Sequence, residues 1–195
     1  MKHPAPIAKT PATYQDVLDA PDGMVAELIN GVLHVQPRPA SLHARASFRL
    51  AGRLDDPFEN GVGGPGGWWF AIGPELHLGS DVLVPDLAGW RRERVPDVPD
   101  VTAIDTPPDW VCEILSPRTR EYDLTEKRAV HAQAGVPWLW LIDPDSRTLE
   151  SFALEEGRWV LVAAIHGDVE ARVAPFDAVG FALGALWPPA PRTET

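Results

Sequence analysis

Short apolar runs separated by turn residues predict most of the secondary structure of this chain. Residues 25–29 and 32–35 are two such runs, and they flank Asn30-Gly31, the dipeptide best able to adopt the two positive φ angles of a type I′ turn. This pattern predicts a β-hairpin. A second hairpin is expected from residues 148–154 and 159–165. Further strand-like runs cover residues 68–70, 75–78, 82–90, 110–115 and 138–142.

Two segments carry the signals of helices. In the first, Ser41 is the expected N-cap. The apolar positions that follow it recur every four residues, at Leu42, Ala46, Leu50 and Leu54. In the second, Asp123 as N-cap and Glu126 at the third helical position form a capping-box arrangement. Gly135 stands where a glycine commonly ends a helix.

The order of these elements predicts the fold class. Hairpin, helix, several strands, helix, strand and hairpin indicate an α/β domain, with a mixed β-sheet flanked by helices and additional β-hairpins, rather than a doubly wound parallel fold. We expect a single domain over residues 12–187, because 195 residues with 45% hydrophobic content can bury one sizeable core. The ends, residues 1–11 and 188–195, are rich in proline and are expected to be flexible tails.

Composition narrows the classes of function. The single Cys112 allows no intramolecular disulfide, and no apolar stretch approaches the ~20 residues of a membrane span, so we expect a cytoplasmic protein without a membrane partner. The net charge of −11 argues against a surface that holds nucleic acid by bulk positive charge. Arg91, Arg92 and Arg94 form the one tight basic cluster, which we interpret as a solvated loop beside a strand end.

Several common catalytic and cofactor motifs are excluded. Gly61, Gly63 and Gly66 match G-x-G-x-x-G, but Pro65 interrupts the run and a strand follows it, whereas a dinucleotide-binding fingerprint opens a helix. No G-x-S-x-G, H-E-x-x-H, P-loop or paired C-x-x-C occurs, so we assign no cofactor-binding residues of these classes. We interpret the eight tryptophans mainly as core residues. The alternative is stacking on unpaired bases by Trp68, Trp69 or Trp90.

Two carboxylates lie in segments that otherwise resemble buried strands. Asp86 follows the apolar run 82–84, and Glu113 lies within the run 110–115. An ionised group in such a place is costly unless a cation or a proton neutralises it. On neighbouring strands the two would converge on a hard cation such as Mg²⁺, which prefers a few carboxylates and water. Lys127 is the third candidate, because it is the only lysine outside the N-terminal tail and an ammonium can orient water in ways a guanidinium cannot.

With their surroundings, these residues resemble the Uma2-like family of restriction endonucleases (DUF820), within the PD-(D/E)XK nuclease superfamily. The resemblance covers roughly residues 14–187. It is carried by Ala26-Glu27-Leu28-Ile29-Asn30-Gly31, His43, Val84-Pro85-Asp86, residues 111–117, residues 123–127 and residues 135–143. It implies a restriction-endonuclease-like core in which Asp86 and Glu113, on adjacent strands, bind one or two Mg²⁺ ions, with Mn²⁺ as a substitute. A lysine then helps to position the attacking water.

The chain departs from the superfamily pattern at one position. That pattern places a lysine two residues after the glutamate, where this chain has Leu115. Lys127, in the following helix, is the position that matches Uma2-like sequences. The resemblance therefore implies Asp86, Glu113 and Lys127 as catalytic residues, the first two also as metal ligands. If Lys127 points elsewhere, we expect metal binding without cleavage.

Glu27, His43 and Glu75 are accessory candidates. Glu27 lies in an apolar strand within the stretch that matches the family, and a cross-strand charged pair is its alternative. His43 falls in the first turn of the first predicted helix, where a polar helix-face residue is the simpler interpretation. Glu75 follows Pro74 at a strand start, where a solvated edge carboxylate is the simpler one.

The resemblance predicts a metal-dependent endonuclease that hydrolyses phosphodiester bonds in DNA and leaves 5′-phosphate and 3′-hydroxyl ends. A homodimer is expected for cutting duplex DNA, because two strands need two sites. The alternative is a catalytically inactive nuclease-fold protein that serves as a DNA- or protein-binding module, which the acidic composition favours. The carboxylates inside strands favour the enzyme, since a scaffold has no need of them.

Overall fold

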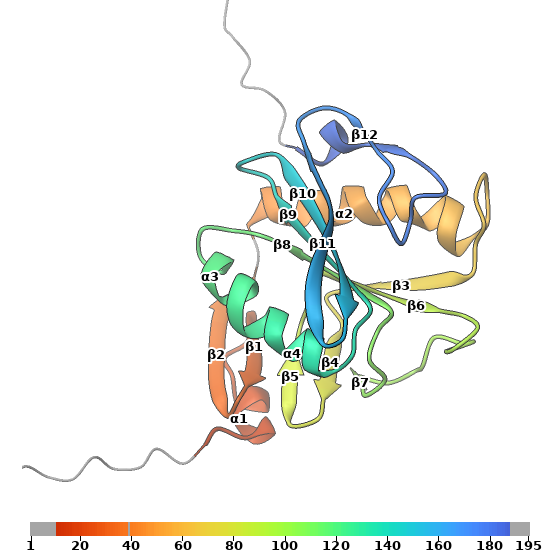
Figure 1. Ribbon diagram of the computed structural model, residues 1–195. Helices are drawn as coiled ribbons and strands as arrows, with labels where there is room; N and C mark the ends of the chain where they lie inside the picture. Colours follow the sequence, from red (N-terminus) through yellow and green to blue (C-terminus); the bar gives the residue numbers. More distant parts are fainter. Residues whose placement is uncertain (1–10, 39, 188–195) are drawn as a thin grey trace, which may run out of the picture.

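The computed structural model describes residues 11–38 and 40–187, and every structural statement below concerns these residues. Most of the two predicted tails, residues 1–10 and 188–195, lies outside them. The architecture is mixed α/β, as predicted, with two β-sheets, a short strand pair and helices packed against them (Figure 1). No helix in the described part of the chain is long and apolar enough to cross a membrane.

The six-stranded sheet, here called the central sheet, forms the middle of the molecule. In spatial order its strands are β11 (Arg158–His166), β10 (Thr148–Glu155), β9 (Trp138–Asp143), β8 (Trp110–Ile114), β6 (Leu87–Arg91) and β3 (Trp68–Ile72). β8 and β9 run parallel, and the other neighbouring pairs are antiparallel. β8 and β9 are buried on both faces, which explains why their sequences are apolar almost without interruption.

A smaller five-stranded sheet, here called the second sheet, contains the first predicted hairpin. Its strands, in order, are β2 (Val32–Pro37), β1 (Met24–Ile29), β5 (Asp81–Leu83), β4 (Glu75–Leu78) and β7 (Ala103–Ile104). Asn30 and Gly31 have φ angles of 52° and 73°, so the predicted turn between β1 and β2 is confirmed. The remaining strands, β12 (Glu170–Ala171) and β13 (Phe181–Ala182), pair only with each other.

Helical segments pack against the two larger sheets. They are α1 (Tyr14–Leu18), α2 (Ser41–Leu54), η1 (Asp55–Glu59), α3 (Arg120–Tyr122), η2 (Asp123–Lys127), α4 (Arg128–Gln133) and η3 (Leu183–Leu186). α2 packs Ala46, Leu50 and Leu54 onto one face. α3, η2 and α4 follow one another without a break, and Val130 packs on the opposite face together with apolar residues of the second sheet (Figure 1).

Tryptophans and phenylalanines fill both cores. The ring of Phe176 lies 4.9–5.5 Å from five other aromatic rings, those of Phe58, Trp68, Phe70, Trp110 and Trp140. On the opposite face, Trp69 stacks on Trp90 with 4.2 Å between ring centroids. Trp68, Trp69 and Trp90 are all buried, so the alternative that they stack on bases is wrong and the core interpretation is confirmed.

The predicted strand 82–90 is in fact two strands of different sheets. β5 ends at Leu83 in the second sheet, and β6 begins at Leu87 in the central sheet. Pro85 lies between them, and proline has no N–H for a strand ladder. Asp86 therefore lies at the crossing between the two sheets, immediately before β6, and not inside a strand.

Both predicted helix starts were misplaced. Ala40, not Ser41, is the N-cap of α2, and Leu42 is 55% exposed, outside the apolar face. Asp123 caps nothing, because the helix already begins at Arg120 and the Asp123 side chain is buried within it. Gly135, with φ of 75°, follows the C-cap of α4 as predicted.

Candidate active site

Asp86 and Glu113 come together where β6 begins and β8 ends. Leu87 pairs with Cys112 in the antiparallel register, which places the preceding Asp86 beside Glu113 across the two strands. The backbone N–H of Ile114 donates a hydrogen bond of 2.7 Å to Asp86 Oδ2. The strand pairing thus fixes the two carboxylates as neighbours, which the sequence left conditional.

Lys127 brings a positive charge to Glu113. Residues alternate between the faces of β8, so Glu113 points to the face covered by the helical segment α3–α4. Lys127 Nζ lies 2.9 Å from Glu113 Oε2 and also donates to the carbonyl of Val84 at 3.2 Å. Leu115, where the superfamily pattern has its lysine, is buried and apolar. Lys127 therefore lies beside the glutamate although it comes from the next helix.

Glu27 joins the same cluster from the second sheet. Its Oε1 lies 3.2 Å from Lys127 Nζ and accepts the backbone N–H of Val84 at 2.7 Å. Its Oε2 accepts from the Gln36 side chain at 3.4 Å. Glu27 is fully buried, so this carboxylate binds the second sheet to the helix rather than facing solvent.

The charges of the cluster shift one another's pKa. Burial alone lowers the pKa of Lys127, but the negative charges of Glu113, Glu27 and Asp123 outweigh it and raise the pKa well above 10.5. Burial raises the pKa of Glu113, and the charge of Lys127 reverses this, leaving it below 4.5. Lys127 is therefore an ammonium and Glu113 a carboxylate throughout the neutral pH range.

Asp123 is the weakly held carboxylate of the cluster. Its Oδ1 lies 3.7 Å from Lys127 Nζ, one helical turn away. Burial raises the pKa of Asp123 to about 7, and the nearby charge of Glu113 adds to the rise. The sequence analysis interpreted Asp123 as an N-cap and missed its contact with Lys127. A position four residues before the lysine suits either role.

Two histidines contact the two candidate metal ligands. His43, at the start of α2, has Nε2 3.2 Å from Asp86 Oδ2. Burial lowers the pKa of His43, but the hydrogen bond and charge of Asp86 raise it above 6.5. His131 has Nε2 3.3 Å from Glu113 Oε1 and is fully buried. The sequence analysis missed His131, although its position four residues after Lys127 places both on one helix face.

Several buried polar atoms around the cluster have no hydrogen-bond partner in the described structure. They include His43 Nδ1, His131 Nδ1 and the hydroxyl of Tyr122. Burial, with the negative charge of Glu27, raises the pKa of Tyr122, so this hydroxyl stays protonated and can donate. Buried polar groups without partners are rare in native proteins and call for water, an ion or a ligand.

The sequence comparison assigns the chain to a family. A family model described as "Uma2: Putative restriction endonuclease" matches residues 11–184. The chain belongs to the Uma2 family. No curated protein matches its sequence.

A solved structure has the same fold as this Uma2-family chain. It is the crystal structure of a "putative nuclease belonging to DUF820" from Anabaena variabilis. The two share 21% sequence identity with a TM-score of 0.72, over 91% of this chain and 98% of the other. The resemblance to the Uma2 family inferred from the sequence is thus confirmed, and so is the fold.

The donors in this Uma2-family site fit a hard divalent cation better than zinc. Among residues 11–38 and 40–187, no three His, Cys, Asp or Glu side chains are arranged to hold a metal ion, so a closed zinc site of four protein ligands does not fit. Mg²⁺ is usually held by one or two carboxylates and keeps several waters. Asp86 and Glu113 supply two carboxylates, and Asp86 Oδ1 makes no hydrogen bond to the described residues.

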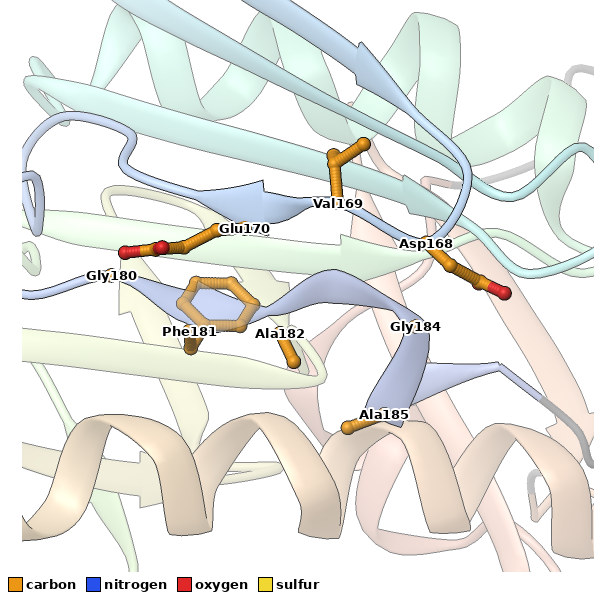
Figure 2. A pocket seen from close by; sticks show the side chains of 8 residues that line it. All are labelled: Asp168, Val169, Glu170, Gly180, Phe181, Ala182, Gly184 and Ala185. Carbon is orange, nitrogen blue, oxygen red and sulfur yellow. The ribbon is translucent and has the colours of Figure 1, made fainter.

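Glu75 and a surface pocket beside β12 and β13 lie apart from this cluster. Glu75 accepts a hydrogen bond from Tyr14 at 2.7 Å and contacts His77 at 2.9 Å, so the structure does not bring it to the other candidates. The pocket, of about 530 Å³, contains no residue of the cluster (Figure 2). It is lined by Asp168, Val169, Glu170, Gly180, Phe181, Ala182, Gly184 and Ala185. It is a shallow hollow beside β12 and β13, with no histidine or cysteine in its lining.

Proposed function

We propose that this Uma2-family chain is a metal-dependent endonuclease that hydrolyses phosphodiester bonds in DNA. The observation that carries the proposal is the cluster of Asp86, Glu113 and Lys127, contributed by three separate segments. Stability alone does not explain it, because a well-packed apolar substitute for a buried ion cluster is often equally stable or more stable. Perturbed, mutually coupled charges in one place are typical of catalytic sites.

The charge balance of the cluster supports a bound cation. Among the described residues, Lys127 contacts three acidic side chains, those of Glu27, Glu113 and Asp123, while Asp86 contacts His43. Apart from the two histidines, negative charge therefore exceeds positive charge in a largely buried place, where an unpaired charge is costly. A divalent cation at Asp86 and Glu113 would remove this excess. When bound there, it would polarise the phosphate and lower the pKa of a bound water.

Lys127 acts in this proposal as a fixed positive charge. Its raised pKa excludes a role as general base at neutral pH. The ammonium would instead stabilise the negative charge that develops on the phosphate as water attacks phosphorus. The bond from phosphorus to the 3′ oxygen would break, which leaves a 5′-phosphate and a 3′-hydroxyl. Glu27 and Asp123 hold the ammonium in place.

The partners follow from this chemistry. The substrate is DNA, and Mg²⁺ or its substitute Mn²⁺ is the metal. Cutting a duplex favours a homodimer, which analytical ultracentrifugation of the purified protein would detect. A cytoplasmic location agrees with the unpaired, buried Cys112.

One observation favours an inactive binding module as the second candidate. Glu113 already has both oxygens engaged, Oε2 by Lys127 and Oε1 by His131. A metal at Glu113 would compete with one of these contacts. If neither contact yields, the cluster would serve only to join the helix, β8 and the second sheet.

Cleavage of labelled plasmid and single-stranded DNA with Mg²⁺ or Mn²⁺ tests the proposal. We would compare wild type with the near-isosteric variants Asp86→Asn, Glu113→Gln and Lys127→Met, each checked for folding by circular dichroism. Glu75→Gln is the matched control, because it also neutralises a partly buried glutamate but lies outside the cluster. We expect metal-dependent nicking that falls about a hundredfold or more in the three cluster variants and persists in the control.

The outcomes test both the residue assignments and the choice between the two candidates. Loss in the carboxylate variants alone would remove Lys127 from the catalytic set. Equal loss in Glu75→Gln would indicate that the effect is general rather than local. A folded wild type that cleaves no substrate, and shows no Mn²⁺ binding by calorimetry, would refute the nuclease and leave the binding module.

A further inference from the structure

The arginines of this chain fall into two groups. Five have a carboxylate within 4.0 Å: Arg91, Arg92, Arg94, Arg120 and Arg172. The three arginines of the basic cluster at residues 91–94 are therefore all paired with carboxylates. Other arginines have no such partner within the described residues, and three of them belong to one helix, α2. We call Arg45, Arg49 and Arg53 the α2 arginine row.

The row forms a continuous basic strip. Its members are spaced by four residues, so they lie along one side of the helix with about 6 Å of axial rise between neighbours. All three are exposed. Ser41–Leu54 contains no acidic residue, in a chain whose net charge is −11. Local charge on α2 is thus opposite to that of the protein as a whole.

The same helix leads into the candidate active site. His43, two residues before Arg45 and on another side of α2, contacts Asp86 at 3.2 Å. The opposite side of α2, with Ala46 and Leu50, is packed against the central sheet and cannot move away from it. The row therefore has a fixed position relative to the carboxylates, on the side of α2 that faces away from the central sheet, and the helix that carries it begins near Asp86.

Phe48 adds an aromatic surface to this strip. Its side chain is 70% exposed, the highest value among the large apolar residues of the described structure. It lies between Arg45 and Arg49 in the sequence, on the solvent side of α2. An exposed aromatic ring among cations is the usual arrangement for holding a nucleic-acid strand, with bases stacked on the ring and phosphates on the cations.

We propose that the α2 arginine row is the surface that binds the DNA strand leading to the active site, with Phe48 as a stacking surface for an unpaired base. The proposal rests on the proposed nuclease function and adds its substrate-binding surface. A strand along the ~12 Å from Arg45 to Arg53 carries roughly three or four phosphates, enough for each guanidinium to contact one. Binding by a local strip also removes the conflict between a polyanionic substrate and an acidic protein.

Binding in EDTA tests the surface without cleavage. We would measure the anisotropy of fluorescein-labelled single-stranded and duplex oligonucleotides over a series of KCl concentrations. Arg45→Gln/Arg49→Gln is compared with Arg158→Gln/Arg172→Gln, which removes the same charge from exposed residues outside α2. We expect the slope of log affinity against log salt to fall by about 1.5 to 2 in the first pair and to stay unchanged in the second. Phe48→Ala should weaken single-strand binding about tenfold and duplex binding less.

The outcomes distinguish this proposal from the function on which it rests. An equal fall of the salt slope in both double variants, or no measurable DNA binding by wild type, would refute the proposed role of the row. Metal-dependent cleavage that is unaffected by Arg45→Gln/Arg49→Gln at low DNA concentration would refute the row and leave the nuclease. Selective loss of binding in a protein that never cleaves would support the row and refute the nuclease. Unchanged DNA binding by Phe48→Ala would refute the stacking contact and leave the arginine row.

Discussion

Replacing Lys127 by methionine should destabilise the fold strongly, because it removes the cation from three carboxylates at once. Glu113 and Glu27 lie 2.9 and 3.2 Å from Nζ and are 2% and 0% exposed. Neither gains water when the ammonium is removed. Methionine keeps most of the volume, so the loss is one of charge pairing and not of packing.

The magnitude follows from the burial of the carboxylates left behind. Breaking a buried ion pair by removing one partner costs about 3–5 kcal/mol, since the remaining charge stays buried and unpaired. Asp123 offsets part of this cost, because its pKa of about 7 lets it take up a proton. For a chain of 195 residues the loss corresponds to a fall of roughly 10 °C in the melting temperature.

The pH dependence identifies the cause. The pKa of Glu113 is lowered in the folded state, so its contribution is present above the unfolded pKa of about 4 and is lost as the pH falls through the folded value. The pKa of Lys127 is raised, so its contribution is present below about 10.4 and is lost only at higher pH. The loss of unfolding free energy caused by Lys127→Met should therefore be largest near neutrality and shrink below about pH 4.

Urea unfolding in EDTA, followed by tryptophan fluorescence at several pH values, measures the effect. Arg118→Met is the control, because it removes an exposed cation without a carboxylate partner among the described residues. It should change stability by less than about 0.5 kcal/mol. A loss of unfolding free energy in Lys127→Met below about 1 kcal/mol at neutral pH, or a loss that does not vary with pH, would refute the reasoning.

Three further predictions concern other charges and contacts. The raised pKa of Asp123 means that wild type loses stability as the pH rises from about 4 to 7, and Asp123→Asn should flatten this slope in urea titrations. Gly89→Ala should cost about 1–3 kcal/mol by the same assay, because the added Cβ would lie 2.9 Å from Phe70. Asp109→Ala removes the carboxylate partner of Arg94 and the acceptor of the Arg91 N–H, and should speed proteolysis between residues 91 and 109. An unchanged cleavage rate would contradict the last expectation.

The sequence predicted the fold best where a local signal has one physical meaning. Asn30-Gly31 gave the β1–β2 hairpin, because few other dipeptides adopt two positive φ angles. The apolar run at 138–142 gave β9, which is buried on both faces. The prediction failed at residues 82–90, since β5 and β6 are each strand-like and only their partners, β1 and β8, reveal two different sheets.

The candidate site, too, was predicted only in part from the sequence. Asp86 and Glu113 were visible because a carboxylate in an apolar run is anomalous in itself. Their closeness depends on the pairing of β6 with β8, which no local pattern specifies. His131 was missed because a lone histidine on a helix carries no signal until the Lys127 face is known to be buried.

Net charge is a poor guide to the partners of this protein, because acidic and basic side chains are unevenly distributed over the structure. Counting residues gives −11 and argues against a polyanion. In the structure, the buried carboxylates Glu27, Glu113 and Asp123 surround Lys127, and others such as Asp109 pair with arginines. Three arginines without a carboxylate partner among the described residues lie on one helix, α2, which has no acidic residue and whose His43 contacts Asp86. A DNA strand within a Debye length of about 8 Å responds to that local field far more than to the sum.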